Sequence, residues 1–91
     1  MCVRCVVSGR VQGVFYRASA RHEAEQLGIS GYARNLVNGS VEVLACGKKS
    51  AVEDLCAWLA KGPKHARVSN VVCENAEPEV SSGYGPDFRI E

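Results

Sequence analysis

The order of apolar segments along the chain constrains its fold more than any other feature. Apolar residues that alternate with polar ones, or recur at helical spacing, predict strands at 2–8, 30–37, 40–46 and 66–76 and helices at 16–27 and 50–61. With short connections and right-handed crossovers, the order β-α-β-β-α-β favours a ferredoxin-like split βαβ sandwich. We therefore expect an α+β fold: a four-stranded antiparallel sheet in the order 4-1-3-2, two helices on one face, and a short C-terminal strand at 87–90.

Several local signals predict where these elements end. Gly28 is expected to stop the first helix in a left-handed conformation. Asn38-Gly39 is typical of a two-residue type I′ hairpin turn, in which both central residues have positive φ. Ser50-Ala51-Val52-Glu53 resembles a capping box that begins the second helix, and Gly62-Pro63 ends that helix. Residues 78–86 are rich in Gly, Ser and Pro, which predicts a loop.

Length and charge set the class of protein. Ninety-one residues suit one domain, and we expect residues 1–91 to form it. The net charge of +1 lacks the strongly basic character of extended nucleic-acid binding. No apolar run is long enough to span a membrane, and Met1–Arg4 shows no signal peptide. We therefore expect a cytoplasmic monomer that binds neither nucleic acid nor membrane.

The segment Gly9–Arg17 joins the first strand to the first helix and has the features of an anion site. Its glycines allow the backbone to curl so that several N–H groups point inward. The helix N-terminus adds partial positive charge, and Arg17 adds a charged fork suited to phosphate or carboxylate. The alternative is an ordinary strand-to-helix connection with a surface arginine.

Asn35 is the second candidate, near the end of the second strand. Because that strand runs parallel to the first in this fold, Asn35 is expected at the same end of the sheet as Arg17. An amide side chain can orient a water molecule through one donor and one acceptor, but it cannot act as a general base. The alternative is an asparagine that only caps the hairpin.

No other catalytic constellation emerges from the sequence. His22 and His65 fall on a helix surface and in a loop, and this topology places neither near the Gly9–Arg17 segment. No Ser-His-Asp set, paired carboxylates or metal cluster is found. An enzyme with this sequence is expected to work by positioning and electrostatics, without a covalent step.

Five cysteines are many for this length. Cys2-x-x-Cys5 lacks a second pair and puts its thiols on opposite faces of a strand, which argues against zinc. Buried reduced thiols are the expected state in a cytosolic core. Cys2 and Cys46 would lie close together on the helix-free face, so a disulfide there is geometrically allowed; two reduced thiols are the alternative.

Two motifs resemble the signatures of the acylphosphatase family. Gly9–Arg17 (GRVQGVFYR) resembles the first signature, and Gly31–Leu36 with Asn38–Val43 resembles the second. The likeness extends to Trp58-Leu59 and to Asp87-Phe88-Arg89-Ile90, and so spans nearly the whole chain. It implies an acylphosphate phosphohydrolase, which cleaves a carboxyl–phosphate anhydride to a carboxylate and inorganic phosphate.

The resemblance also implies roles for individual residues. Arg17 would bind the phosphoryl group together with main-chain amides of the loop, those of Gln12, Gly13, Val14, Phe15 and Tyr16. Asn35 would position the attacking water, and no metal or cofactor would take part.

Two other functions stay open at this point. One is a non-catalytic ferredoxin-like module that binds an anion or a protein partner through the same loop. The other is RNA binding by the helix-free sheet face, although the central strands lack the aromatic residues that such a surface needs.

Overall fold

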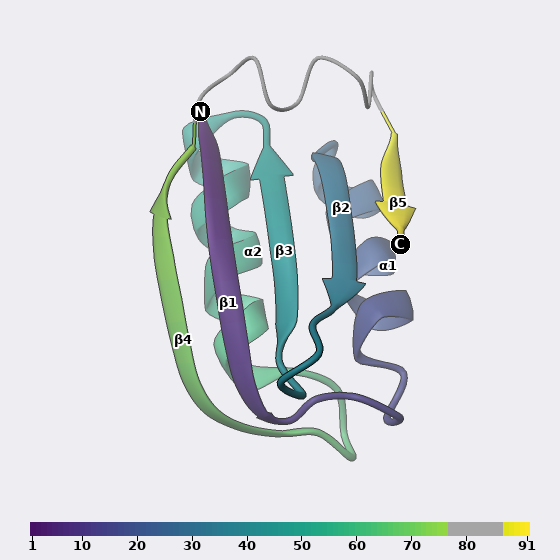
Figure 1. Ribbon diagram of the computed structural model, residues 1–91. Coiled ribbons are helices and arrows are strands. Elements are labelled where there is room, and N and C mark those ends of the chain that lie inside the picture. Colours follow the sequence, from purple (N-terminus) through teal and green to yellow (C-terminus); the bar gives the residue numbers. More distant parts are fainter. Residues whose placement is uncertain (77–86) are drawn as a thin grey trace.

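One sheet with the spatial order β4-β1-β3-β2-β5 forms the centre of the molecule, and both helices lie against one of its faces (Figure 1). The computed structural model describes residues 1–76 and 87–91. Its elements are β1 (Cys2–Arg10), α1 (Tyr16–Leu27), β2 (Ser30–Asn35), β3 (Val41–Cys46), α2 (Lys49–Lys61), β4 (Arg67–Asn75) and β5 (Phe88–Ile90). The loop expected at 78–86 lies outside the described residues.

The predicted strand order is confirmed, and β5 adds a fifth strand. β1 pairs antiparallel with both β3 and β4, and β2 pairs antiparallel with β3. β5 pairs with β2 in the parallel direction, with Gly31 opposite Phe88 and Ala33 opposite Ile90. The sheet is therefore mixed, and the end of the chain lies along the outer edge of β2 (Figure 1).

The core lies between the sheet and the helices. Val3, Cys5 and Val7 of β1 are buried on the helix side, whereas Arg4 and Val6 face the other way, as strand alternation requires. The helices bury one stripe each at helical spacing, formed by Tyr16, Ala20 and Ala24 of α1 and by Val52, Leu55 and Leu59 of α2. The small alanines let α1 approach the sheet closely.

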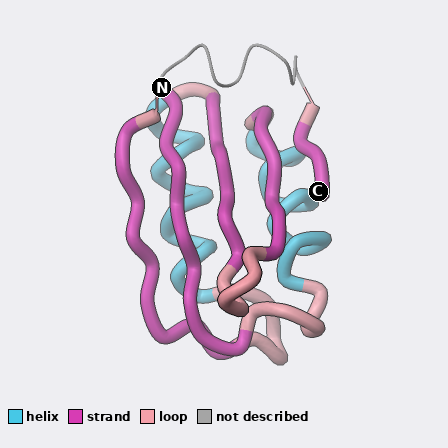
Figure 2. The backbone as a smooth tube through the Cα atoms, in the orientation of Figure 1, coloured by secondary structure: helices cyan, strands magenta, loops and turns pink. Residues whose placement is uncertain are grey.

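Three connections meet at one end of the sheet, the lower end in Figure 2. They are the β1–α1 loop (residues 11–15), the β2–β3 loop (residues 36–40) and the α2–β4 connection (residues 62–66). They meet because β1 and β2 run in the same direction, and because β4 starts beside the end of β1, with Arg10 opposite Arg67. This end of the molecule therefore brings together residues from three distant parts of the sequence.

The structure confirms one predicted helix boundary and corrects another. Gly28 ends α1 in the left-handed conformation (φ 70°, ψ 30°), and its N–H donates to main-chain oxygens of the last turn. The capping box expected at Ser50 is wrong. The helix N-cap is Lys48, whose backbone is extended, and it makes no side-chain cap hydrogen bond. Ser50 therefore lies inside the first turn, where it cannot act as the cap.

The Asn38-Gly39 hairpin turn also differs from the expectation. β2 ends at Asn35, not at residue 37, so five residues connect it to β3. Gly39 has positive φ (92°), but Asn38 does not, which excludes a type I′ turn. Instead the Gly39 N–H donates to Leu36 O (3.1 Å), and the Asn38 side chain accepts from the Ser40 N–H (3.0 Å). The side-chain bond stabilises a longer loop that dipeptide rules do not anticipate.

Four of the five cysteines form disulfides, so the expectation of reduced thiols holds only for Cys56. Cys2 pairs with Cys46 on the helix-free face, with a Cα–Cα distance of 4.1 Å. Cys5 pairs with Cys73 across β1 and β4, and the Cys56 sulfur lies 3.9 Å from that of Cys5. Burial, reinforced by the charge of Glu53, raises the pKa of the Cys56 thiol.

Within the part of the chain that the structure describes, neither helix is long and apolar enough to cross a membrane.

Candidate active site

The β1–α1 loop presents a group of unpaired main-chain amides. In residues 1–76 and 87–91, the N–H groups of residues 12–16 have no hydrogen-bond acceptor. The loop curls through Gly13 (φ 76°) and through Phe15, the only described non-glycine residue with positive φ (61°). A non-glycine residue in this conformation costs about 1–3 kcal/mol and is found mostly at functional sites. Such a curled run of free N–H groups at a helix N-terminus is suited to binding an anion.

Arg17 lies in the first turn of α1, and its position is fixed from the far end of the chain. Its Nη1 donates to the main-chain oxygen of Glu91 at 2.8 Å. Glu91 is itself held by the sheet, because its N–H donates to the Ala33 oxygen at 2.9 Å. The guanidinium keeps further N–H groups for a ligand, since arginine has five donors.

Arg17 and Asn35 line the same cavity, which has a volume of about 270 Å³. The cavity lies between the β1–α1 loop, the start of α1 and the ends of β2 and β5, and its lining is completed by Val11, Gly13, Phe15, Tyr16, Ala18 and Ile90. Asn35 is exposed, and in the described ranges its side chain has no hydrogen-bond partner. The structure thus brings together the two side chains singled out in the sequence, while their roles stay predictions.

The side chain of Gln12 connects the two halves of the site, a function that the sequence analysis missed. Its Nε2 donates to the main-chain oxygens of Leu36 and Ser40, both at 2.9 Å. These oxygens belong to the loop that follows Asn35 directly. The sequence offered only a glutamine in a loop, and the partners become visible only when the β2–β3 loop is placed beside it.

Tyr16 anchors the start of α1 in the core. Its hydroxyl donates to the main-chain oxygen of Leu59 at 2.6 Å, and its ring centroid lies 5.7 Å from that of Trp58. Burial raises the pKa of the Tyr16 hydroxyl well above its ordinary value of 10. The residue next to Arg17 is therefore fixed against α2, which also fixes the first turn of the helix.

The expectation that His65 lies away from the loop is wrong. His65 lines a second cavity of about 620 Å³ together with Gly13, Val14 and Phe15 of the loop. The reason is the antiparallel pairing of β1 with β4, which starts β4 where β1 ends. His22, in contrast, is exposed on α1 and contacts Gln26, as expected for a helix surface.

Comparison with known proteins identifies the family of the chain and solved structures with the same fold. The family model described as acylphosphatase matches residues 3–90. An acylphosphatase of Legionella pneumophila (strain Lens) is 59% identical over 75 residues, which are 82% of this chain and 82% of that protein. An acylphosphatase structure from Coxiella burnetii has a TM-score of 0.89 at 43% identity, covering 99% of this chain and 90% of that one. The Bacillus subtilis acylphosphatase structure has a TM-score of 0.90 at 28% identity, covering 99% and 97%.

The chain therefore belongs to the acylphosphatase family.

Proposed function

We propose that this chain hydrolyses the carboxyl–phosphate anhydride of small acylphosphates to a carboxylate and inorganic phosphate. In this proposal Arg17 and the free amides of residues 12–16 hold the phosphoryl group, and Asn35 orients the attacking water. The observation that supports it most directly is the shared cavity of Arg17 and Asn35, beside amides that have no other acceptor. Membership of the family supports the reaction itself.

The chemistry of the substrate explains why so sparse a site is enough. The leaving group is a carboxylate, which departs without strong acid catalysis. Phosphoryl transfer passes through a loose transition state, in which charge is spread over the peripheral phosphate oxygens. Donors fixed around those oxygens stabilise that charge, and a water held in line with the scissile P–O bond lowers the entropic cost of attack. No metal or cofactor is needed for these steps.

Each residue group has one task in this mechanism. The loop amides and the Arg17 guanidinium group bind the three peripheral oxygens. The hydrogen bond from Arg17 to Glu91 keeps the guanidinium group in one orientation. Asn35 accepts a hydrogen bond from the water through its Oδ1 and so directs the water's lone pair toward phosphorus. Because none of the described residues that line this cavity is a general base, a phosphate oxygen of the substrate takes the water's proton in this mechanism.

The direct test is hydrolysis of benzoyl phosphate by the wild-type chain in EDTA, with phosphate and benzoate both quantified. The expected result is rapid turnover with equal amounts of the two products. A folded protein that gives no turnover would contradict the proposal and leave an anion-binding module. Activity that returns only when a divalent metal is added would contradict the metal-free mechanism.

We also propose that the chain acts as a cytoplasmic monomer formed by a single domain over residues 1–91, without a nucleic-acid or membrane partner. Size-exclusion chromatography with light scattering tests the monomer. Trapping thiols in intact cells tests the compartment, because cytosolic thiols are normally kept reduced and alkylation of the cysteines paired as Cys2–Cys46 and Cys5–Cys73 would then support the cytoplasm. Fully protected cysteines in that experiment would point to an oxidising compartment.

A further inference from the structure

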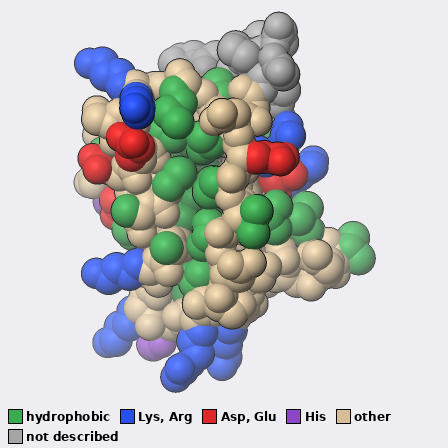
Figure 3. All heavy atoms as spheres, turned by 90° about the vertical axis from the view of Figure 1, so that its left-hand side faces the viewer, with side chains coloured by type: hydrophobic (Ala, Val, Ile, Leu, Met, Phe, Trp, Pro, Cys, Tyr) green, Lys and Arg blue, Asp and Glu red, His purple; other side chains and the backbone are tan. Residues whose placement is uncertain are grey.

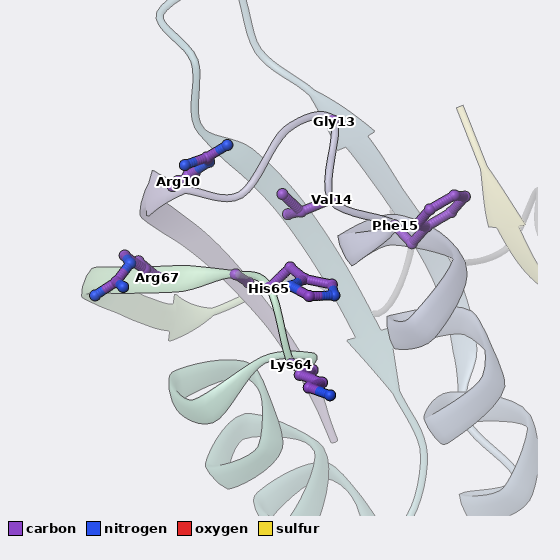
Figure 4. A pocket seen from close by; sticks show the side chains of 8 residues that line it. Arg10, Gly13, Val14, Phe15, Lys64, His65 and Arg67 are labelled. Carbon is purple, nitrogen blue, oxygen red and sulfur yellow. The ribbon is translucent and has the colours of Figure 1, made fainter.

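Among the residues that the structure describes, those lining the 620 Å³ cavity beside the β1–α1 loop are basic or apolar, and none is acidic. Its cationic residues are Arg10, Lys64 and Arg67, with His65 between them (Figure 4). The cavity shares Gly13 and Phe15 with the 270 Å³ cavity that holds Arg17 and Asn35. The two cavities therefore flank the same curled loop, and the basic one is the larger.

Arg10 and Arg67 lie directly opposite each other in the β1–β4 pairing. Like charges at opposed cross-strand positions destabilise a sheet. The pairing of Arg10 with Arg67 follows a shift of register between Ser8 and Gly9. Only glycine suits position 9, because its φ is 122° and a Cβ there would collide with the main-chain oxygen of Arg67. Bulges of this kind re-aim side chains next to active sites.

No carboxylate compensates these charges in the described part of the chain. The salt bridges there join Arg4 and Arg34 to Glu42, on the helix-free face of the sheet. Figure 3 shows a group of Lys, Arg and His side chains at the lower end of the molecule with no acidic side chain among them, whereas the basic side chains of the upper part lie near acidic ones. An anion bound between Arg10 and Arg67 would relieve their repulsion.

We propose that this basic cavity is a subsite for a second anionic group, carried by the acyl part of the substrate. The inference rests on the proposed function and names its substrate class: acylphosphates whose acyl group ends in a carboxylate or a phosphate. The shared residues Gly13 and Phe15 favour a substrate that reaches from one cavity into the other. A cavity of 620 Å³ has room for an acyl chain as well as its terminal anion.

The experiment compares three aromatic substrates: benzoyl phosphate, 4-carboxybenzoyl phosphate and 4-phosphonobenzoyl phosphate. The para group is remote from the scissile bond, so differences in kcat/KM report binding of the second anion. We expect the wild-type chain to favour one or both anionic substrates about fivefold to tenfold, because exposed charge pairs contribute modestly. The preference should shrink when the ionic strength is raised, since exposed charges are screened. The carboxylate and phosphonate arms distinguish which anion the subsite takes.

Variants assign the effect to the cavity. The double variant Lys64→Gln/Arg67→Gln is expected to lose the preference and to keep the wild-type kcat/KM for benzoyl phosphate. The matched control Lys49→Gln/Arg21→Gln removes the same two charge types from exposed positions on the helices, outside the cavity, and should retain the preference.

Three outcomes would count against the proposal in distinguishable ways. Failure to hydrolyse benzoyl phosphate contradicts the proposed function, and with it the subsite. Normal benzoyl phosphate hydrolysis with no preference for anionic tails overturns the subsite alone. A preference that both double variants lose equally would assign it to overall charge and would also overturn the subsite.

Discussion

The Nε2 of Gln12 lies 2.9 Å from the main-chain oxygen of Ser40 and binds it. The same nitrogen also binds Leu36 O, so one amide couples the β1–α1 loop to the loop that follows Asn35. We expect Gln12→Leu to lower kcat on benzoyl phosphate about 10–100-fold, because small misplacements of reacting groups have effects of this size. Unpairing the two oxygens should also lower the free energy of unfolding by about 1–3 kcal/mol. Gln26→Leu on the α1 surface is the control, and a kcat within twofold of wild type in Gln12→Leu would contradict the coupling.

Arg17→Ala is expected to lower kcat/KM at least about 10²–10³-fold, the usual effect of removing a preorganised donor. Inhibition by inorganic phosphate should weaken in parallel, because in the proposed mechanism the same guanidinium group binds the phosphate product. Arg17→Lys should restore little of the lost kcat/KM, since a lysine ammonium lacks the planar, bidentate geometry of the guanidinium group. Steady-state kinetics with phosphate as inhibitor measures both effects, and Arg21→Ala on the same helix serves as the control. Unchanged phosphate inhibition in Arg17→Ala would exclude a role in binding the phosphoryl group.

Asn35→Ala should separate catalysis from binding. We expect kcat to fall about 10²–10³-fold while the inhibition constant for phosphate stays near its wild-type value, because the proposed mechanism gives Asn35 a contact with the water and none with the phosphoryl group. Asn70→Ala, at an exposed position of β4, is the matched control. A near-normal kcat in Asn35→Ala would remove its role in positioning water.

The buried Tyr16 hydroxyl predicts a loss of stability at alkaline pH. Its pKa is raised in the folded state, so above pH 10 the unfolded chain releases this proton while the folded chain keeps it. The unfolded state then binds fewer protons, and the free energy of unfolding falls as pH rises. Urea titrations between pH 9 and pH 11.5 should show this fall, and Tyr16→Phe should make it shallower. A slope that is identical in the two proteins would contradict the assignment.

Gly9→Ala tests whether the register shift in β1 depends on glycine. The substitution combines an unfavourable φ with a Cβ that collides with the Arg67 main chain, and we expect it to cost about 2–4 kcal/mol of stability. Gly28→Ala, also at positive φ but with open space around its Cβ, should cost only about 1 kcal/mol. Thermal or urea unfolding of the two variants measures the difference. An equal loss of stability in the two variants would show that β4 can move away from position 9 at little cost in free energy, and would contradict this prediction.

The features predicted correctly from the sequence were those set by periodicity. Alternation in β1 and helical spacing in α1 and α2 predicted these elements and the face that each one buries. The order of the elements along the chain then predicted the strand order. Together with the parallel direction of β1 and β2, they placed Arg17 and Asn35 at one end of the sheet. These signals are local, and right-handed connections leave few ways to assemble them.

The errors arose where a distant contact overrides a local preference. Asn38 bonds the Ser40 N–H and so extends the β2–β3 loop beyond a two-residue turn. His65 reaches the β1–α1 loop because β4 pairs with β1, although it is 50 residues away from Phe15 in the sequence. The hydrogen bonds of Gln12 and the Cys5–Cys73 disulfide were missed for the same reason. Their partners are set by how the strands and loops lie beside one another, and spacing along the chain does not reveal them.

The two disulfides are interleaved along the chain, since Cys5 lies inside the Cys2–Cys46 loop and Cys46 lies inside the Cys5–Cys73 loop. Under tension applied to the two termini, the shortest covalent path runs from Met1 to Cys5, across to Cys73, and on to Glu91. Residues 6–72 lie off that path, so a pulling force would not stretch this segment, and Arg17 and Asn35 would bear no load. Cleaving Cys5–Cys73 alone would transfer the load to Cys2–Cys46 and lengthen the tethered chain in one discrete step.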